Sequence, residues 1–500
     1  MATTTGSYLT ASAIATTVAA VAAGYVLWSL LRNVFASPIP PSVPGPFLAR
    51  LTSKWILLVD LSGYRARTVH ALHMKYGPVV RVAPNELSFA NKEAIRAIYG
   101  PGTTCTKSEA YESFGRKGMF QMQDPEEHRQ RQRRMAHVFS AGNLQQIEPL
   151  IQAVIDRVVD AIAARAGQAT DALHWCRMMA LDVSGEVLMG KSFGAFEGDK
   201  APTYAQQLDI TFLVLALQNL SPLLCSALKL LPIAGIQAFF SAPDKIYQYA
   251  FDALEEYIKA NGRGSARRTL LTKLIARNPE TGAEPLPDHI IGVELSNTLF
   301  AGTDTTGNTA TYALYRLAFL PEWQKKLREE LRASRVRADN FSFRSLQSLP
   351  VLNGVFMETL RLHPAAPSAL PRVTTRTTII GGLQLPAQTL VSMQAYSTQR
   401  DPTYFPDPER FDPSRWIAAD GTISPGTPDV QEMMLAWGKG SRACIGQYMA
   451  TMEIKIVLAR IIDRFEAKLE GESTHDDMEM TDHFSLVPKG HRCGLIFSEV

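Results

Sequence analysis

Paired cysteines are missing from this sequence of 500 residues. Its five cysteines are scattered, and no two of them are separated by just two residues. This pattern excludes a zinc finger and a disulfide framework, and it fits a reducing compartment. A cysteine with a chemical role would therefore act without a second cysteine as its partner.

An excess of charge of one sign is also missing. The chain has 51 Lys and Arg residues against 48 Asp and Glu residues, which leaves a net charge of +3. So balanced a chain is not typical of a nucleic-acid-binding protein, and we expect no nucleic acid partner. The dinucleotide fingerprint G-x-G-x-x-G is absent as well, so no flavin or nicotinamide site is predicted.

Low-complexity tracts and internal repeats are absent too. Hydrophobic residues make up 46% of the chain and charged residues 20%, which are values of a globular protein. At about 150 residues per domain the length would suggest roughly three domains. Because no linker interrupts the sequence after residue 46, we expect one large domain over residues 47–500.

Charged side chains are missing from the N-terminal segment, where the first one is Arg32. Residues 11–31 are apolar or small, and at about 1.5 Å per residue a helix of this length spans a hydrocarbon core. We predict a lumenal N-terminus at 1–10 and a transmembrane anchor at 11–31, with the body in the cytosol. A cleaved signal peptide is the alternative, but it would need a basic start and a shorter core.

The anchor is followed by a proline-rich hinge at 32–46. Beyond it, apolar residues recur mostly with the period of a helix. The helices with the clearest bounds are expected at about 288–319, 322–333, 352–362 and 445–465. Strand-like segments lie at 76–89, 373–380, 390–394 and 484–497, of which the first and last have the pattern of a hairpin. The sequence thus predicts a mainly helical fold with small β-sheets.

The strongest chemical motif is the loop Trp437-Gly438-Lys439-Gly440-Ser441-Arg442-Ala443-Cys444-Ile445-Gly446, just before a predicted helix. Glycines let the backbone pass close to a bulky group, and a helix start stabilises a thiolate. A cysteine in this setting can hold a haem iron through sulfur, with Arg442 beside a haem propionate. The alternative is a structural cysteine after a glycine-rich turn.

A second motif lies in the middle of the helix predicted at 288–319. The run Ala301-Gly302-Thr303-Asp304-Thr305-Thr306 contains a glycine, three threonines and an acid, which are poor helix formers. Ala301 and Thr305 share one helix face, where a small residue leaves room for a ligand and a hydroxyl can bind it. Asp304 can supply protons. Alternatively, the threonines bond back to helix carbonyls and kink the helix.

Two weaker motifs complete the set. Glu358 and Arg361 are three residues apart and so share a helix face, as many surface ion pairs do. Pro408-Glu409-Arg410-Phe411 lies in a proline-rich segment and would by itself be only a loop.

In this order, the four motifs resemble the cytochrome P-450 superfamily, and the resemblance covers residues 38–500. The phrase PDPERFDPSRW resembles filamentous-fungal members of secondary metabolism, near the pisatin demethylase and benzoate hydroxylase types. The resemblance implies the cytochrome P-450 fold with a single haem domain. It also implies insertion of one oxygen atom of dioxygen into a hydrophobic small molecule, by hydroxylation, epoxidation or successive oxidations. The N-terminal anchor matches the microsomal branch, which implies the endoplasmic reticulum membrane.

The resemblance also implies roles for single residues. Cys444 matches the axial ligand of haem iron, and the loop residues Trp437, Gly438 and Gly446 match its cofactor contacts. Thr305 and Asp304 match the pair that delivers protons, beside Ala301 at the haem. Arg442 and Arg372 match the arginines that bind the haem propionates. Glu358, Arg361 and Arg410 match a buried structural triad.

The sequence departs from the family pattern at two places. Trp437 stands where the family has phenylalanine. The family's W-x-x-x-R appears as His128 to Gln132, so His128 keeps a donor for a propionate while the arginine is missing. Arg131 and Arg133 are both candidates for the missing arginine, and the sequence does not choose between them.

By family position, the substrate pocket is lined by mostly apolar residues, although each of them taken singly fits the core better than a substrate contact. They are Phe114, Phe120, Phe212, Phe300, Leu370 and Leu486. The family uses haem b and takes electrons from NADPH through a separate flavoprotein, the NADPH–cytochrome reductase. Basic residues for that partner are Arg129, Arg131, Arg133, Arg134 and Lys439, although a solvated helix face would look the same.

Two other functions are compatible with the sequence. Some relatives isomerise or dehydrate peroxides without a reductase, and these often lose the acid–alcohol pair that Asp304 and Thr305 keep here. A non-enzymatic haem-binding membrane protein would not need that pair at all.

Overall fold

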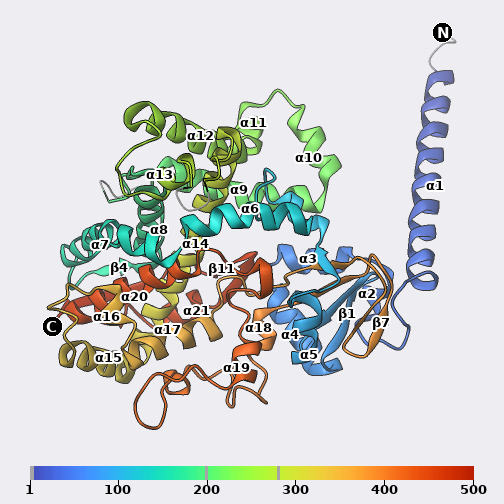
Figure 1. The fold of residues 1–500 in the computed structure, drawn as a ribbon. Coiled ribbons are helices and arrows are strands. Elements are labelled where there is room, and N and C mark those ends of the chain that lie inside the picture. The colour runs from blue at the N-terminus through green and yellow to red at the C-terminus, as the bar shows by residue number, and fades with distance from the viewer. Residues whose placement is uncertain (1–4, 197–200, 279–281) are drawn as a thin grey trace.

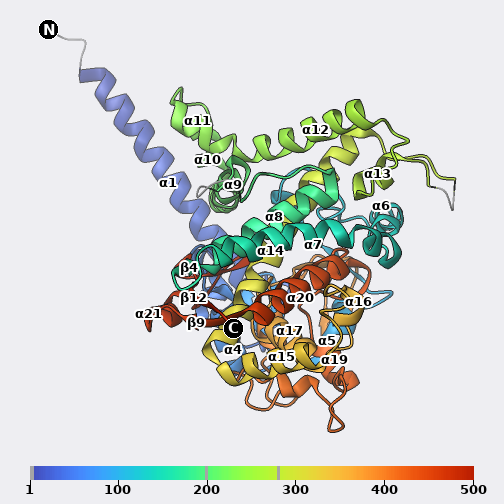
Figure 2. The same ribbon diagram turned by 90° about the vertical axis from the view of Figure 1, so that its left-hand side faces the viewer.

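The computed structural model describes all residues except 1–4, 197–200 and 279–281, so the N-terminal stretch predicted at 1–10 lies partly outside it. The N-terminal part of helix α1 (Thr5–Phe35) projects away from the body of the molecule in both views (Figures 1 and 2). Among the helices of the described residues, none is long and apolar enough to span a membrane. The anchor at 11–31 therefore stays a prediction.

The centre of the body is helix α14 (Asp288–Phe319), whose bounds match the predicted segment. It packs most extensively on α8 (Ala172–Met189), and also on α12 (Ala242–Asn261) and α20 (Gln447–Arg464). Most of its side chains are buried, because helices cover it on several sides. Helices α9 to α12 lie on one side of α14, and α15 and α19 on the other, in both views (Figures 1 and 2).

The other helices fill the space around this centre, and the predicted helices at 322–333 and 352–362 are α15 and α17. The bounds are as follows: α2 (Phe47–Leu51), α3 (Lys54–Leu61), α4 (Arg65–Tyr76), α5 (Lys92–Tyr99), η1 (Glu109–Ser113), α6 (Pro125–Val138), α7 (Ala141–Ala163), α9 (Thr203–Leu220), α10 (Pro222–Lys229), α11 (Ala234–Phe240), α13 (Leu270–Ile275), α15 (Pro321–Ala333), α16 (Phe343–Leu346), α17 (Pro350–Leu362), α18 (Ala395–Thr398), η2 (Pro413–Trp416), α19 (Pro428–Met433), η3 (Gly440–Arg442) and α21 (Ser473–Asp477).

A small sheet of five strands has the order β1-β2-β8-β5-β3, in which β2 and β8 are parallel. The hairpin predicted at 76–89 is confirmed, because Ala83 pairs with Glu86 across the turn Pro84-Asn85. The segment predicted as one strand at 373–380 divides into β5 and β6. The strands are β1 (Val79–Ala83), β2 (Glu86–Phe89), β3 (Cys105–Lys107), β5 (Arg372–Thr374), β6 (Thr378–Ile380), β7 (Leu383–Leu385) and β8 (Leu390–Met393).

The C-terminal hairpin predicted at 484–497 is wrong. The hairpin is instead formed by β10 (Met480–His483) and β11 (Ser485–Pro488), and Phe484 makes the turn with a φ of 75°. Strand β12 (Gly494–Glu499) pairs with β9 (Phe465–Leu469) and β4 (Ala169–Asp171) in another sheet. Strands β11 and β12, which the sequence predicted to pair with each other, have a similar apolar pattern but belong to different sheets.

One hydrophobic cluster reaches from Ala66 to Phe497 and contains buried residues of α7, α8, α14, α17 and α20. A second cluster fills the space between the five-stranded sheet and α5. The prediction of a mainly helical body with small sheets is confirmed.

Candidate functional site

The cysteine loop has a backbone that only glycine adopts easily at two positions. Gly438 and Gly440 have φ values of 68° and 65°, in the left-handed region. A Cβ at Gly440 would collide with the carbonyl oxygen of Tyr99 at the end of α5. The loop is closed by the N–H of Cys444, which donates to the carbonyl of Trp437 at 2.8 Å. This turn places the sulfur at the entry to α20.

Cys444 differs from the other four cysteines, which are all buried, because its side chain is exposed. The surrounding protein still desolvates the thiol and raises its pKa, while the backbone N–H groups of Gly446 and Gln447 lower it by donating to the sulfur. The arrangement supplies donors for a thiolate and leaves the sulfur accessible, as an axial ligand requires.

Helix α14 is exposed on one face in its middle. Ala301 is exposed and Thr305 is half-buried, although Thr303, Asp304 and Thr306 between and beside them are buried. The Thr305 hydroxyl donates to the carbonyl of Ala301 at 2.7 Å. Back-bonding therefore occurs, as the alternative reading of the motif expected, and it leaves the lone pairs of Oγ1 on the open face.

Asp304 turns to the other side of α14, toward α8. Its Oδ1 accepts from Nε of Arg177 at 2.9 Å, and Arg177 also pairs with Asp209 of α9 at 2.6 Å. Burial raises the pKa of Asp304, and the Arg177 guanidinium partly opposes that rise. Sequence reasoning missed Arg177, because no local pattern marks a residue that contacts a helix so far along the chain.

Four nitrogen-bearing side chains gather between the sheet and the start of α6. Arg372 donates to the Tyr111 hydroxyl at 3.1 Å, and Arg442 donates to the Met122 carbonyl at 2.6 Å. The other two members are His128 and Lys107, both buried. Within the described ranges, none of the four forms an ion pair with a carboxylate. We call these four residues the cation cluster.

The members of the cation cluster repel each other's charges. Burial, and then Arg442, Lys107 and Arg372, lower the pKa of His128 to about 4. Burial, and then Arg372, lower the pKa of Arg442 to about 10. Arg372 is buried and Arg442 is half-buried, and neither forms an ion pair with a carboxylate among the described residues, so the cluster can accept an anion. The two carboxylates of a haem fit this requirement. Lys107 was missed by the sequence analysis.

Arg131 is not available for this role, which corrects one of the two alternatives for the missing arginine. Its guanidinium pairs with the carboxylate of Glu294, a buried residue of α14. Glu294 also accepts from the N–H of Met119 at 2.9 Å. The other alternative, Arg133, is exposed on α6. His128 is the residue of the W-x-x-x-R position that the structure brings into the cation cluster.

The Glu358–Arg361 pair is fully buried and bidentate, with N–O distances of 2.8 and 2.7 Å. Arg361 also donates to three backbone carbonyls, those of Gln399, Pro408 and Arg410. A surface ion pair is thereby excluded, and the arginine fastens the segment that follows residue 399 onto α17.

The third arginine of this triad is Arg415, and the prediction of Arg410 is wrong. Arg415 Nε lies 3.3 Å from Glu358 Oε1, whereas Arg410 contributes its backbone carbonyl. Trp416 also donates to Glu358, at 3.0 Å. The sequence holds the pattern P-x-R-aromatic twice, at 408–411 and at 413–416, and the second copy is the one that reaches the carboxylate.

Four of the six candidate pocket residues form two aromatic pairs, and the other two are Leu370 and Leu486. Phe114 and Phe120 lie with their ring centroids 5.9 Å apart, and Phe212 and Phe300 lie 4.5 Å apart. Leu486 is fully buried in the main core. Phe484, two residues before it, contacts Phe114 instead, with their ring centroids 4.4 Å apart.

The remaining candidates are half-buried. Leu370 packs against the core between the sheet and α5, and Trp437 packs against the main core.

Comparisons with known proteins identify relatives of the chain. A family model described as Cytochrome P450 matches residues 43–494. The chain is similar to "Cytochrome P450 monooxygenase ORF9" of Penicillium roqueforti, with 30% identity over 91% of this chain and 89% of the relative. It is also similar to "Cytochrome P450 monooxygenase tazI" of Aspergillus terreus, with 28% identity over 93% and 94%. "Benzoate 4-monooxygenase bphA" of Aspergillus niger is 28% identical over 91% and 92%.

Proposed function

The chain belongs to the cytochrome P450 family, and on that premise we propose that it oxidises a hydrophobic small molecule with haem b as its cofactor. It is a haem-thiolate monooxygenase of the fungal secondary-metabolism type, which uses dioxygen and electrons from a redox partner. The observation that carries the proposal is the exposed Cys444, with two backbone N–H groups aimed at its sulfur. Feeding terpenoid, polyketide and alkaloid precursors to a host that expresses the chain with a reductase tests the substrate class.

The residues of the site have separable tasks. When bound, the haem supplies the activation of dioxygen. Cys444 would hold it through sulfur, and the cation cluster would hold its carboxylates. Ala301 keeps the open face of α14 free of side-chain bulk. Thr305 Oγ1 can accept a proton and pass it on by rotating away from the Ala301 carbonyl, 2.7 Å distant.

Asp304 can resupply that proton, because burial raises the pKa of its carboxyl. Its contact with Arg177 holds the carboxylate toward α8 and away from the exposed face of α14. Proton supply from Asp304 therefore requires that its ion pair with Arg177 loosens. The rest of the chain positions the substrate and excludes water.

We expect the Thr305→Ala variant to lose about 10²-fold in product formation, because a positioned proton donor contributes on the order of this factor. NADPH consumption should continue and peroxide should accumulate. Measuring NADPH, product and peroxide in one assay gives the coupling.

Thr303→Ala is the matched control for that variant. Thr303 makes the same back-bond, to the Leu299 carbonyl at 2.9 Å, but its side chain is buried away from the open face. This control should keep the wild-type coupling. Full coupling in Thr305→Ala would remove the threonine from the proton path.

We further propose that NADPH–cytochrome reductase is the electron donor. Arg133 and Arg134 of α6 are exposed and offer positive charge to an acidic flavoprotein, and Arg129 is exposed beside them but pairs with Glu126. Product formation should require NADPH and the reductase and should fall as salt is added. Full turnover with neither would favour a reductase-independent isomerase or dehydratase, a reading that the relatives' names do not favour.

We also propose that α1 attaches the chain to the endoplasmic reticulum membrane with the body in the cytosol. Its support is the absence of charge before Arg32 and the position of α1 away from the body (Figure 1). After alkaline carbonate extraction, the full chain should stay in the membrane pellet, and a chain that lacks residues 1–35 should move to the supernatant. Extraction of the full chain would contradict the anchor.

A further inference from the structure

Three phenylalanine rings lie together between two distant parts of the chain. Phe114 and Phe120 belong to the 114–121 segment, which connects η1 to α6. Phe484 lies in the turn between β10 and β11 and contacts both rings, with centroid distances of 4.4 and 5.9 Å. We call these three rings the aromatic wall. Phe120 is 38% exposed, so the wall presents ring surface to a ligand.

Two asparagines of α14 fasten the segments that carry the aromatic wall. Asn297 Nδ2 donates to Oε1 of Gln121 at 3.2 Å, in the 114–121 segment. Asn308 Nδ2 donates to the Leu486 carbonyl at 2.5 Å, in β11. The two asparagines are separated by eleven positions, close to three helical turns, so they lie on the same face of α14.

That face is the one on which Ala301 and Thr305 stand. Asn297, Ala301 and Thr305 follow each other at intervals of four residues, which places them in one row along the helix. At about 1.5 Å per residue, Asn297 lies about 6 Å along the axis from Ala301 and about 12 Å from Thr305. The aromatic wall is therefore fastened at both ends of the exposed face of α14.

Asn297 is the point where α14, α12 and the 114–121 segment meet. Its Oδ1 accepts from the Tyr247 hydroxyl at 3.2 Å and from Nε2 of Gln121 at 3.4 Å. Gln121 is buried, and its Nε2 also donates to the carbonyl of Phe114 at 2.8 Å. The Tyr247 hydroxyl in turn accepts from the N–H of Arg116. The amide of Asn297 thus joins two groups that both hold the backbone beside Phe114.

Two glycines let the 114–121 segment approach these partners. A Cβ at Gly118 would collide with Nδ2 of Asn297, and a Cβ at Gly115 would lie 2.6 Å from the Tyr247 hydroxyl. Gly115 also has a φ of 101°, which favours glycine. The segment is shaped to lay its backbone against Asn297 and Tyr247.

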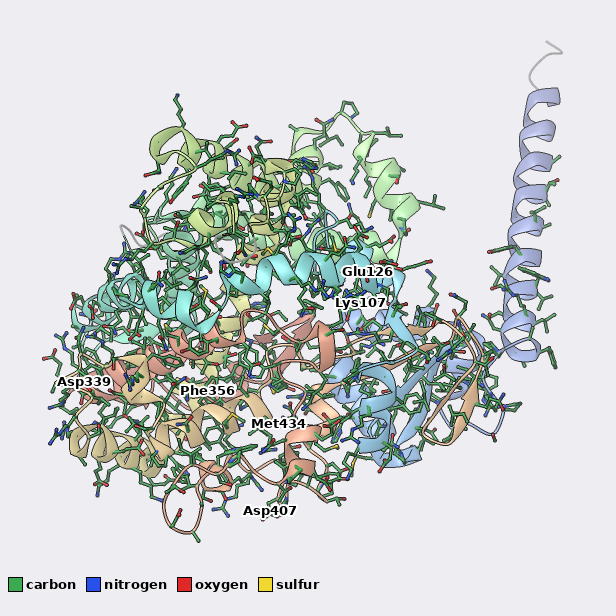
Figure 3. The ribbon with its side chains drawn as sticks, in the orientation of Figure 1. Lys107, Glu126, Asp339, Phe356, Asp407 and Met434 are labelled. Carbon is green, nitrogen blue, oxygen red and sulfur yellow. The ribbon has the colours of Figure 1, made fainter. Side chains whose placement is uncertain are left out.

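Phe120 is fastened independently of Asn297. Its carbonyl accepts from Nζ of Lys107, which Figure 3 shows next to the N-terminal end of α6. The N–H of Met119 donates to the carboxylate of Glu294 at 2.9 Å. Because these two contacts remain, we expect a variant of Asn297 to move Phe114 without unfolding the segment.

We propose that Asn297 is a positioning residue that holds the aromatic wall beside the exposed face of α14, and that the wall so placed selects ligands with a flat aromatic ring. A ring beside Ala301 gains from the wall because aromatic pairs attract at centroid distances of about 4.5–7 Å. The inference rests on the proposed function, since it takes the exposed face of α14 as the place where the substrate lies. None of the four sequence motifs contains Asn297.

The first measurement compares two ligands of the purified ferric protein. Imidazole and 4-phenylimidazole both bind ferric haem through a ring nitrogen, and only the second carries a further ring for the aromatic wall. Optical titration gives the ratio of the two dissociation constants. In Asn297→Leu, we expect the preference for 4-phenylimidazole to fall about fivefold, the size of one aromatic contact, while imidazole binds as in wild type.

The second measurement reports the position of the 114–121 segment and needs no ligand. Arg116 and Lys117 are exposed on it, so trypsin cuts there whenever the segment leaves its partners. We expect Asn297→Leu to be cut at these two residues on the order of fivefold faster than wild type, as the loss of a hydrogen bond predicts. Fragment masses identify the bond that is cut.

Tyr247→Phe is a milder variant that keeps the ring and removes one partner of Asn297. It should change both measurements in the same direction by a smaller factor, and it decides the question if Asn297→Leu does not fold. Thr298→Val is the matched control, because Thr298 is the next residue of α14 and its hydroxyl donates to the Glu294 carbonyl at 2.7 Å, within the helix. This control should match wild type in both measurements.

An unchanged ligand ratio in Asn297→Leu and Tyr247→Phe would overturn the proposal, even if trypsin cuts these variants faster. An equal loss of affinity for both ligands would also overturn it, because that result shows a general structural role.

The failure of the proposed function would look different. The wild type itself would then lack the red-shifted Soret band of the reduced carbonyl complex and would bind neither ligand, which would overturn both proposals. If the band is present while the ratio is unchanged, only the role of Asn297 is wrong.

Discussion

Replacing Cys444 by serine abolishes product formation and removes the red-shifted Soret band of the reduced carbonyl complex. The sulfur is the exposed one among the cysteines, and the N–H groups of Gly446 and Gln447 are aimed at it. A serine hydroxyl fits the same turn, so the loop keeps its shape while the strong electron donation of a thiolate is lost. Difference spectra of the purified variant, with haem content measured in parallel, check the result.

The control is Cys225→Ser in α10, where the thiol is buried in a small cluster far along the chain from the loop. We expect this variant to lose about 1–3 kcal/mol of stability from burying a hydroxyl and to keep the red-shifted band. Retention of the band by Cys444→Ser would show that another group ligates the iron.

Replacing Glu358 by alanine should destabilise the protein by about 3–5 kcal/mol, the usual effect of leaving one buried charge without its partner. Arg361 is completely buried and keeps only carbonyl partners once the carboxylate is gone. The segment that carries the cysteine loop follows the residues that this arginine holds. The variant should therefore lose bound haem along with stability, which thermal inactivation and haem content measure together.

Arg415 and Arg410 form a matched pair for the same cluster. Arg415→Ala removes a guanidinium contact with Glu358 and one with the Asp407 carbonyl, at 3.3 and 3.0 Å, so a loss of about 1–3 kcal/mol is expected. Arg410→Ala keeps the backbone carbonyl that Arg361 uses, so its effect should stay within about 0.5 kcal/mol. The opposite order would restore Arg410 to the triad.

The sequence was most informative where the chemistry is local. The geometry of the glycines in the cysteine loop and of the Glu358–Arg361 pair depends on only a few neighbouring residues. The bounds of α14 matched the prediction. The prediction of Arg410 as the third arginine failed, although Arg415 lies in the same segment. The same four-residue pattern occurs twice there, and only packing decides which copy faces α17.

Other parts of the site depend on contacts that no local pattern encodes. Arg177 reaches Asp304 from another helix, and Lys107 meets Arg372 and Arg442 only after the sheet has formed. The placement of Leu486 is of a third kind. Leu486 lies in β11 and is buried in the core, whereas Phe484, two residues before it, lies in the turn and contacts Phe114. The turn at Phe484 has a positive φ that a phenylalanine rarely adopts.

The close approach of Gly440 to the Tyr99 carbonyl has a consequence for the order in which the chain folds. The two residues are about 340 positions apart in the sequence, yet the loop has its final shape only when its backbone rests against the end of α5. Tyr99 in turn is fastened to the sheet, since its hydroxyl donates to the Leu370 carbonyl at 2.8 Å. Contacts between distant segments form late, because they carry the largest loop-closure entropy. We therefore expect the cysteine loop to take its final shape only where the sheet that holds Tyr99 is in place.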